Sequence, residues 1–171
     1  VDAIRKKEWK TIAAALMLYS VHWLYEIANA VICHITGYAL WTVSPESTSF
    51  ILLIGVSWEL SMMFAIAGFL SRLLPADKNL KILGVNNRWL FAIGTALFFS
   101  VVTIFLAWTP AFIWVYPWWG AIPVFITTYI PFFLASFLTY DREPKVQRRW
   151  IGGLAAVNIV LLCVLVPLGI I

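Results

Sequence analysis

Charged residues are scarce in this sequence of 171 residues: only 12% are Asp, Glu, Lys or Arg, whereas 63% are hydrophobic. A soluble domain is about a quarter charged and about half apolar. A water-facing surface could not accommodate this excess of apolar side chains. We therefore expect an integral membrane protein in the cell membrane, and the net charge of +4 indicates no nucleic-acid partner, since the basic residues follow the pattern described below.

Cysteine and histidine are also rare, with two residues of each type. Cys33 and Cys163 lie within apolar segments and are too few for a disulfide framework or a zinc site. The sequence contains no phosphate-binding loop, dinucleotide fingerprint, redox pair of cysteines or hydrolase triad, so we expect no cofactor. The first apolar run is too long for a cleavable signal and lacks a small-residue cleavage site, which favours a span.

Five apolar runs reach the length of about 20 residues that a helix needs to cross a membrane. They are continuous rather than alternating, which excludes a transmembrane barrel. We predict an all-α fold, a multi-pass bundle of five transmembrane helices in one domain covering residues 1–171. The expected helices lie near residues 11–35, 50–73, 89–108, 118–140 and 150–171.

Basic residues occur in three segments only: before the first expected span, between the second and third, and between the fourth and fifth. The other two loops contain none. Because cytoplasmic loops carry the excess of Lys and Arg, this pattern predicts a cytoplasmic N-terminus and an external C-terminus. Binding of anionic membrane lipid is a second expected role for these segments. The basic residues are Arg5, Lys6, Lys7 and Lys10, then Arg72, Lys78, Lys81 and Arg88, then Arg142, Lys145, Arg148 and Arg149.

Three ionisable residues lie within the expected spans, His22 and Glu26 in the first and Glu59 in the second. Such residues are costly in lipid and mark functional sites. His22 and Glu26 are one turn apart, on a face that also carries Asn29. The face of Glu59 includes Gly55, Met62, Met63 and Ile66.

Depth along the helices suggests that polar groups from all five spans meet in one layer. At ~1.5 Å per residue, His22 and Glu59 each lie ~14 Å below the outer edge of the bilayer core. Thr127 and Thr128 lie at about the same level, Ser100 slightly above it and Asn158 at ~18 Å. Trp23 and Trp58 adjoin this layer, where an indole face could hold a cation.

Two prolines, Pro123 and Pro131, fall inside the fourth expected helix. Proline has no N–H to donate and bends a helix, so we expect backbone carbonyls there to be free for other partners.

These residues suggest acid–base chemistry on a lipid. A protonated and an ionised group in one pocket provide an acid and a base. We predict that Glu26 and Glu59, assisted by His22, protonate an alkene and remove a proton elsewhere, with Trp23 and Trp58 stabilising the cation between. Asn29, Met62, Met63, Thr127 and Asn158 are the expected substrate-binding residues. The substrate would be an apolar isoprenoid or sterol-like lipid.

The pattern His22-x-x-x-Glu26, with Glu59 on the next helix and Asn158 further on, resembles the emopamil-binding family of sterol isomerases. That family also has five membrane helices, one His, two Glu and a nearby Trp, so the resemblance implies proton transfer on a lipid. It covers a few residues only. In that family another span precedes the helix that carries His and Glu, whereas here this helix comes first.

Four other interpretations use the same sequence. His22, Glu26, Glu59 and a methionine could bind a metal ion, although the repeated Glu-x-x-His units of di-metal bundles are missing. Glu26 and Glu59 could relay protons in a carrier or channel. The three residues could also hydrogen-bond to one another and fix the helix register. Finally, the short loops and apolar surface suit a non-catalytic subunit with other membrane proteins as partners.

Overall fold

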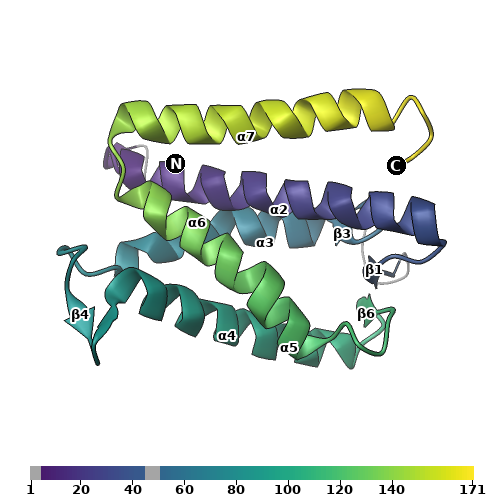
Figure 1. Cartoon of the computed structure of the whole chain (residues 1–171), viewed down its shortest axis with the longest axis horizontal. Coiled ribbons are helices and arrows are strands. Elements are labelled where there is room, and N and C mark those ends of the chain that lie inside the picture. The colour runs from purple at the N-terminus through teal and green to yellow at the C-terminus, as the bar shows by residue number, and fades with distance from the viewer. Residues whose placement is uncertain (1–4, 45–50) are drawn as a thin grey trace.

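The computed structural model describes residues 5–44 and 51–171, and most of them are helical (Figure 1). Within this part of the chain, four helices are long and apolar enough to cross a membrane. They agree within three residues with the first, third and fourth predicted helices, whereas the fifth begins and ends six residues earlier than predicted. Their bounds are α2 (Trp9–Thr36), α4 (Asn87–Ala107), the continuous stretch of α5 (Ala121–Val124), η2 (Phe125–Tyr129) and α6 (Ile130–Tyr140), and α7 (Pro144–Leu165).

The second predicted helix is shorter than expected. The prediction of a helix from residue 50 is wrong over its first turns, because β2 (Ile51–Leu53) and β3 (Val56–Ser57) form an antiparallel hairpin there. Residue 50 itself lies outside the described residues. Helix α3 (Trp58–Ala67) follows and continues as the 3₁₀ helix η1 (Gly68–Leu73).

Local chemistry explains where α3 begins. Ile51, Ile54 and Val56 are β-branched and favour a strand. The hydroxyl oxygen of Ser57 then accepts a hydrogen bond from the backbone N–H of Leu60 at 3.3 Å and caps the first turn of α3. Together α3 and η1 extend over roughly 27 Å at the rises of the two helix types, close to the thickness of a bilayer core.

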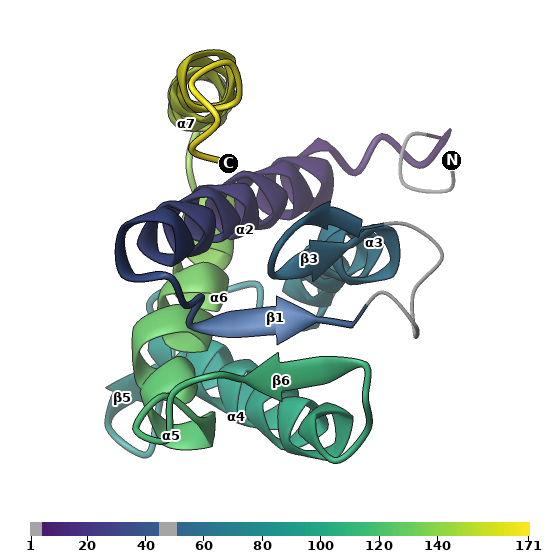
Figure 2. The same cartoon turned by 90° about the vertical axis from the view of Figure 1, so that its right-hand side faces the viewer.

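Helix α2 is the centre of the bundle, with α6, α3, η1 and α7 packed around it. Phenylalanine side chains from α3, α4 and α6 fill the space beside it, among them Phe64, Phe99, Phe132 and Phe133. Seen from the end, α7 lies on the outside of the bundle, on the side of α2 that faces away from α4 (Figure 2). Most of its side chains are therefore exposed to the surroundings of the bundle.

One end of the bundle gathers the basic segments. The start of α2, the hairpin of β4 (Lys81–Ile82) and β5 (Val85–Asn86), and the turn from α6 to α7 all lie there (Figure 1). An ion pair between Glu8 and Arg72, with an O–N distance of 2.6 Å, joins the start of α2 to η1.

The opposite end is closed by a two-stranded antiparallel sheet of β1 (Trp41–Val43) and β6 (Phe112–Trp114) (Figure 2). Trp41 is paired with Trp114, and Val43 with Phe112. The sheet joins the connection after α2 to the connection after α4. Neither this sheet nor the two hairpins was predicted: the segments of β1, β6, β4 and β5 were expected to be loops, and the segment of β2 and β3 was expected to be helix.

Candidate functional site

His22 and Glu26 form a buried pair on α2. Their relative exposures are 0% and 3%, and 3.5 Å separates the imidazole Nδ1 of His22 from the carboxylate Oε1 of Glu26. The spacing of four residues places both side chains on one face of the helix, as predicted. Neither imidazole nitrogen has a hydrogen-bond partner among residues 5–44 and 51–171. A buried polar atom without a partner is uncommon and marks a site where function is worth seeking.

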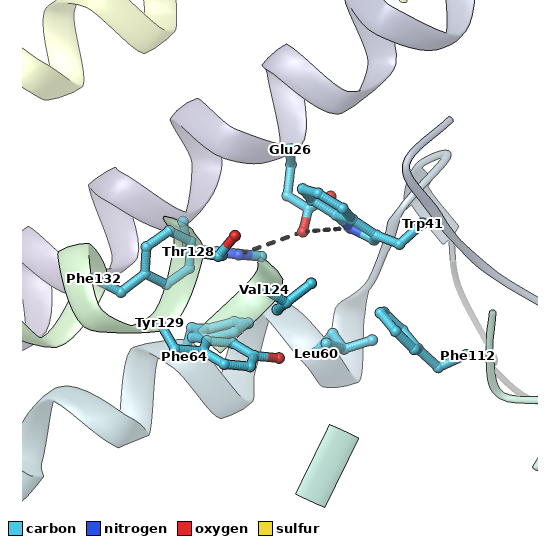
Figure 3. Close-up of a pocket in the computed structure, with 10 residues that line it drawn as sticks. Glu26, Trp41, Leu60, Phe64, Phe112, Val124, Thr128, Tyr129 and Phe132 are labelled. Carbon is cyan, nitrogen blue, oxygen red and sulfur yellow. Dashed lines mark hydrogen bonds and ion pairs between the residues drawn. The ribbon is translucent and has the colours of Figure 1, made fainter. Parts of the chain in front are cut away.

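Trp41 binds the carboxylate of Glu26 from the end of the bundle. Its indole Nε1–H lies 3.3 Å from Oε1 and 3.2 Å from Oε2 of Glu26 (Figure 3). The sequence did not predict this contact, because Trp41 lies outside the expected spans. The signal that could have indicated it is the indole N–H itself, since a buried tryptophan usually finds an acceptor.

Asn29 holds Trp41 in place. Its amide Nδ2 donates to the backbone oxygen of Trp41 at 2.9 Å, and its Oδ1 accepts from the backbone N–H of Leu40 at 2.8 Å. A side chain on Gly55 would overlap both Asn29 and the indole of Trp41, so glycine is needed at this crossing. Asn29 was predicted to bind substrate, but the structure shows it binding the strand that carries Trp41.

A small cavity lies beside the His22–Glu26 pair (Figure 3). Its volume is about 30 Å³. A water molecule needs roughly 10–15 Å³ by this measure, so the cavity has room for about two. The walls come from α2, β1, α3, β6 and the α5–α6 helix, and the lining residues are His22, Glu26, Trp41, Leu60, Phe64, Phe112, Val124, Thr128, Tyr129 and Phe132.

Aromatic rings form most of the wall around the pair. The ring of Phe64 stacks on the imidazole of His22, with centroids 4.3 Å apart and an interplanar angle of 23°. Phe132 meets the same imidazole edge-on at 6.4 Å. The hydroxyl group of Tyr129 is 2.6 Å from the hydroxyl group of Thr103, which fixes the tyrosine ring against the cavity. The site thus combines two ionisable groups with the electron-rich faces of several rings.

The helix opposite α2 is irregular where it reaches the cavity. Residues Phe125–Tyr129 form a π-helix, a type of distortion that occurs frequently at functional sites. Pro131 cannot donate to the carbonyl of Thr127, four residues earlier, and that carbonyl instead accepts from the hydroxyl group of Tyr25 at 2.8 Å. This confirms the prediction that a proline in this helix leaves a carbonyl for another partner.

Of the two neighbouring threonines, Thr128 lines the cavity and Thr127 does not. The hydroxyl group of Thr128 is buried and has no hydrogen-bond partner in the described part of the chain. Thr127, the predicted substrate-binding residue, is exposed on the outside and donates to the carbonyl oxygen of Pro123 at 2.7 Å.

Glu59 is not part of this cavity, so the predicted set of three acid–base residues is not assembled. Leu60 and Phe64 are the residues that α3 turns toward His22. Glu59 is exposed and lines a surface groove together with Met62, Met63 and Ile66. These four residues share one helix face, as predicted, whereas Gly55 lies in the hairpin before α3. The prediction that this face points inward is wrong.

The remaining predicted site residues also lie elsewhere. Trp23 is half-buried and touches the rings of Tyr19 and His22 edge-on without reaching the cavity. Trp58 is 52% exposed. Asn158, on α7, donates from its amide to the backbone oxygen of Ser20 at 2.7 Å and so attaches α7 to α2.

The suggested metal ligands are divided between the cavity and the outer groove. His22 and Glu26 line the first, and Glu59, Met62 and Met63 the second. Across residues 5–44 and 51–171, no group of three His, Cys, Asp or Glu side chains is arranged to hold a metal ion.

Comparisons with known proteins identify a family. Residues 1–167 match the model of an uncharacterized membrane protein family. An uncharacterized protein from Archaeoglobus fulgidus is 37% identical over 166 residues, an alignment that covers 94% of this chain and 79% of the relative. No solved structure matches the chain.

Proposed function

The chain belongs to this uncharacterized membrane protein family, and from that premise we propose that it is a membrane-embedded enzyme that moves protons on an apolar, isoprenoid- or sterol-like lipid. One observation carries the proposal, the buried His22–Glu26 pair on the wall of a cavity inside the helix bundle. Helix register alone is a weak reason to bury these groups, because polar contacts between membrane helices contribute only about 1 kcal/mol.

The pair is suited to moving a double bond. When Glu26 is protonated and His22 is neutral, the pair carries no net charge, which suits an apolar site. The carboxyl group of Glu26 gives its proton to one alkene carbon, and a carbocation forms. His22 then removes a proton from a neighbouring carbon, which restores a double bond at a new position. Return of that proton from His22 to Glu26, over the 3.5 Å that separates them, completes the cycle.

The rings that would stabilise the cation differ from those predicted. Trp23 and Trp58 do not line the cavity, whereas Phe64, Trp41 and Tyr129 do. A cation near the face of an aromatic ring gains about 0.5–2 kcal/mol per ring, more when water is excluded.

A lipid could reach the pair from a surface groove beside α3. One part of the groove, of about 700 Å³, lies between α3–η1 and α4 and includes Glu59, Met62 and Met63. The adjoining part, of about 220 Å³, again includes Glu59 and Met63, and it shares Leu60 and Phe112 with the walls of the buried cavity. A single layer of side chains therefore separates a lipid-sized groove from His22 and Glu26. In this proposal Glu59, Met62 and Met63 bind the lipid and take no part in proton transfer.

Deuterium transfer from solvent tests the enzyme proposal without requiring the product to be known. The protein would be reconstituted with polyprenyl, carotenoid or sterol lipids in D₂O, and deuterium at carbon would be measured by mass spectrometry. We expect incorporation by the wild type and a loss of about 100-fold or more in Glu26→Gln and His22→Ala. Thr127→Val, beside the cavity but facing outward, is the matched control and should retain activity. Equal incorporation in Glu26→Gln and wild type would refute the proposal.

The small size of the cavity favours a second candidate, a proton-coupled carrier or channel. A space for about two water molecules is sufficient for proton transfer but not for a lipid unless Leu60 or Phe112 moves. In this case Glu26 would relay protons without Glu59. Liposomes containing the protein and a pH-sensitive dye would then lose an imposed pH gradient, and Glu26→Gln would abolish the loss. An enzyme of the first kind would show no such flux.

We also propose that the protein crosses the membrane five times, with α3 and η1 as the second crossing and the N-terminus in the cytoplasm. Two findings support this arrangement. The length of α3 with η1 approaches that of a bilayer core, and the three basic segments gather at one end of the bundle (Figure 1).

A further inference from the structure

A polar pocket lies at the basic end of the bundle and shares no lining residue with the cavity beside His22 and Glu26. It has a volume of about 340 Å³ and is formed where the β4–β5 hairpin and the start of α4 meet the turn from α6 to α7. Its lining residues are Lys78, Asn79, Asn86, Arg88, Trp89, Leu138, Asp141 and Arg142. We propose that this pocket binds the phosphate group of an anionic glycerophospholipid.

The charge of the pocket supports an anionic ligand. Arg88 is paired with Asp141, so these two groups neutralise each other. Lys78 and Arg142 then leave the lining with a positive charge. Both side chains are exposed, and in the described part of the chain the ammonium group of Lys78 makes no ion pair and no hydrogen bond. Two cations from separate segments thus face one space, and neither has an acidic partner of its own among residues 5–44 and 51–171.

The position of Arg142 is constrained. The carbon at the centre of its guanidinium group lies 5.0 Å from the centre of the Trp150 ring, within the range of a cation–π contact. The planar guanidinium group presents several N–H donors that match the oxygens of a phosphate group. Asn79 adds an amide to the same lining. The pocket therefore offers donors from more than one direction.

The apolar part of the lining favours a lipid over a free phosphate ion. Trp89, 48% exposed at the first turn of α4, and Leu138, half-buried on α6, form this part. Both helices continue from here along the apolar length of the bundle. A tryptophan at the start of a span is typical of the level of lipid headgroups. A ligand with its phosphate at Lys78 and Arg142 would place its acyl chains along α4 and α6.

Native mass spectrometry of the purified protein in dodecyl maltoside tests this inference. Phosphatidylglycerol would be titrated onto the wild type and onto the double variant Lys78→Ala/Arg142→Gln. Each basic residue near a membrane surface contributes about fivefold in affinity, so we expect binding to weaken roughly 25-fold. The matched control, Lys145→Ala/Arg149→Gln, removes the same charge from exposed positions at the start of α7 outside the pocket, and it should bind within about twofold of the wild type.

Two further ligands separate the possible sources of the phosphate. Diacylglycerol with the same acyl chains lacks the phosphate, and glycerol phosphate lacks the chains; we expect both to bind at least tenfold more weakly than phosphatidylglycerol. The inference is overturned if the control loses affinity as much as the pocket variant, or if either partial ligand binds as tightly as the whole lipid. Should the double variant fail to fold, Lys78→Ala alone should weaken binding about fivefold, and unchanged affinity there would equally overturn it.

Discussion

The guanidinium group of Arg88 holds the carboxylate group of Asp141 through two contacts, Nε to Oδ2 at 2.6 Å and Nη2 to Oδ1 at 2.8 Å. The pair links the first turn of α4 to the end of α6. Arg88 is buried, with a relative exposure of 3%, and it also donates to the backbone oxygen of Pro75 at 2.9 Å. One side chain therefore connects three segments at the basic end of the bundle.

Replacing Asp141 should destabilise the fold. In Asp141→Ala the charge of Arg88 stays buried without its carboxylate, a change that costs about 3–5 kcal/mol. Glu143→Ala removes an acidic residue two positions away that is exposed and makes no capping hydrogen bond, and it should change stability by less than about 0.5 kcal/mol. Unfolding in detergent, followed by tryptophan fluorescence, measures the stability of both variants. Equal stability of the two variants would contradict the structural role of the pair.

Trp41→Phe isolates the hydrogen bonds that Glu26 receives. The variant keeps an aromatic ring on β1 but removes the indole N–H that lies 3.3 and 3.2 Å from the carboxylate oxygens of Glu26. Leaving a buried acceptor without its donor costs about 1–3 kcal/mol. Trp108→Phe, at a position 76% exposed near the same end of the bundle, is the control and should have little effect. The same fluorescence measurement would detect the difference.

Two glycines test how closely η1 approaches α2. A side chain on Gly68 would overlap the backbone of Ala15, so Gly68→Ala should destabilise the bundle by about 1–3 kcal/mol. Gly94, in the middle of α4, has open space around it, and Gly94→Ala should be neutral or stabilise the helix by up to about 1 kcal/mol. In thermal unfolding, we expect Gly68→Ala to lower the melting temperature and Gly94→Ala to leave it unchanged or raise it. If Gly68→Ala left the stability of the protein unchanged, η1 would not pack on α2 as described.

Labelling from one side of the membrane tests the proposed topology. After Cys33→Ser and Cys163→Ser, single cysteines would be introduced as Leu83→Cys in the β4–β5 hairpin and Tyr38→Cys between α2 and β1. Both positions are well exposed, at 94% and 63%. A membrane-impermeant maleimide should label the Tyr38→Cys variant in intact cells and the Leu83→Cys variant only after permeabilisation. The reverse result would invert the proposed orientation.

The sequence predicted four long helices, because a continuous apolar run of about 20 residues is typical of a helix that crosses a membrane. It failed over residues 51–57, where a short apolar run can be either strand or helix and periodicity does not decide between them. The contacts that set the hairpin, such as the close approach of Gly55 to Asn29 and Trp41, come from parts of the chain that are distant in sequence.

The candidate site was predictable only for residues that are close together in the sequence. His22 and Glu26 are one turn apart, so helix geometry alone placed them together. The direction of the Glu59 face was not predictable, because a helix surrounded by lipid and apolar side chains has no water-facing side to indicate which face is buried. Trp41 reaches Glu26 through a strand pairing between two distant connections, and a single sequence does not show that pairing.

The β1–β6 sheet has a mechanical consequence. Its backbone hydrogen bonds connect the segment that bears Trp41 to the segment that bears Phe112, and both side chains border the cavity. Because the two strands are paired, a movement of either connection would shift the indole of Trp41 and the phenyl ring of Phe112 together. In the proposed topology, a molecule that binds this sheet from the external side would therefore act on the buried carboxyl group of Glu26 through Trp41.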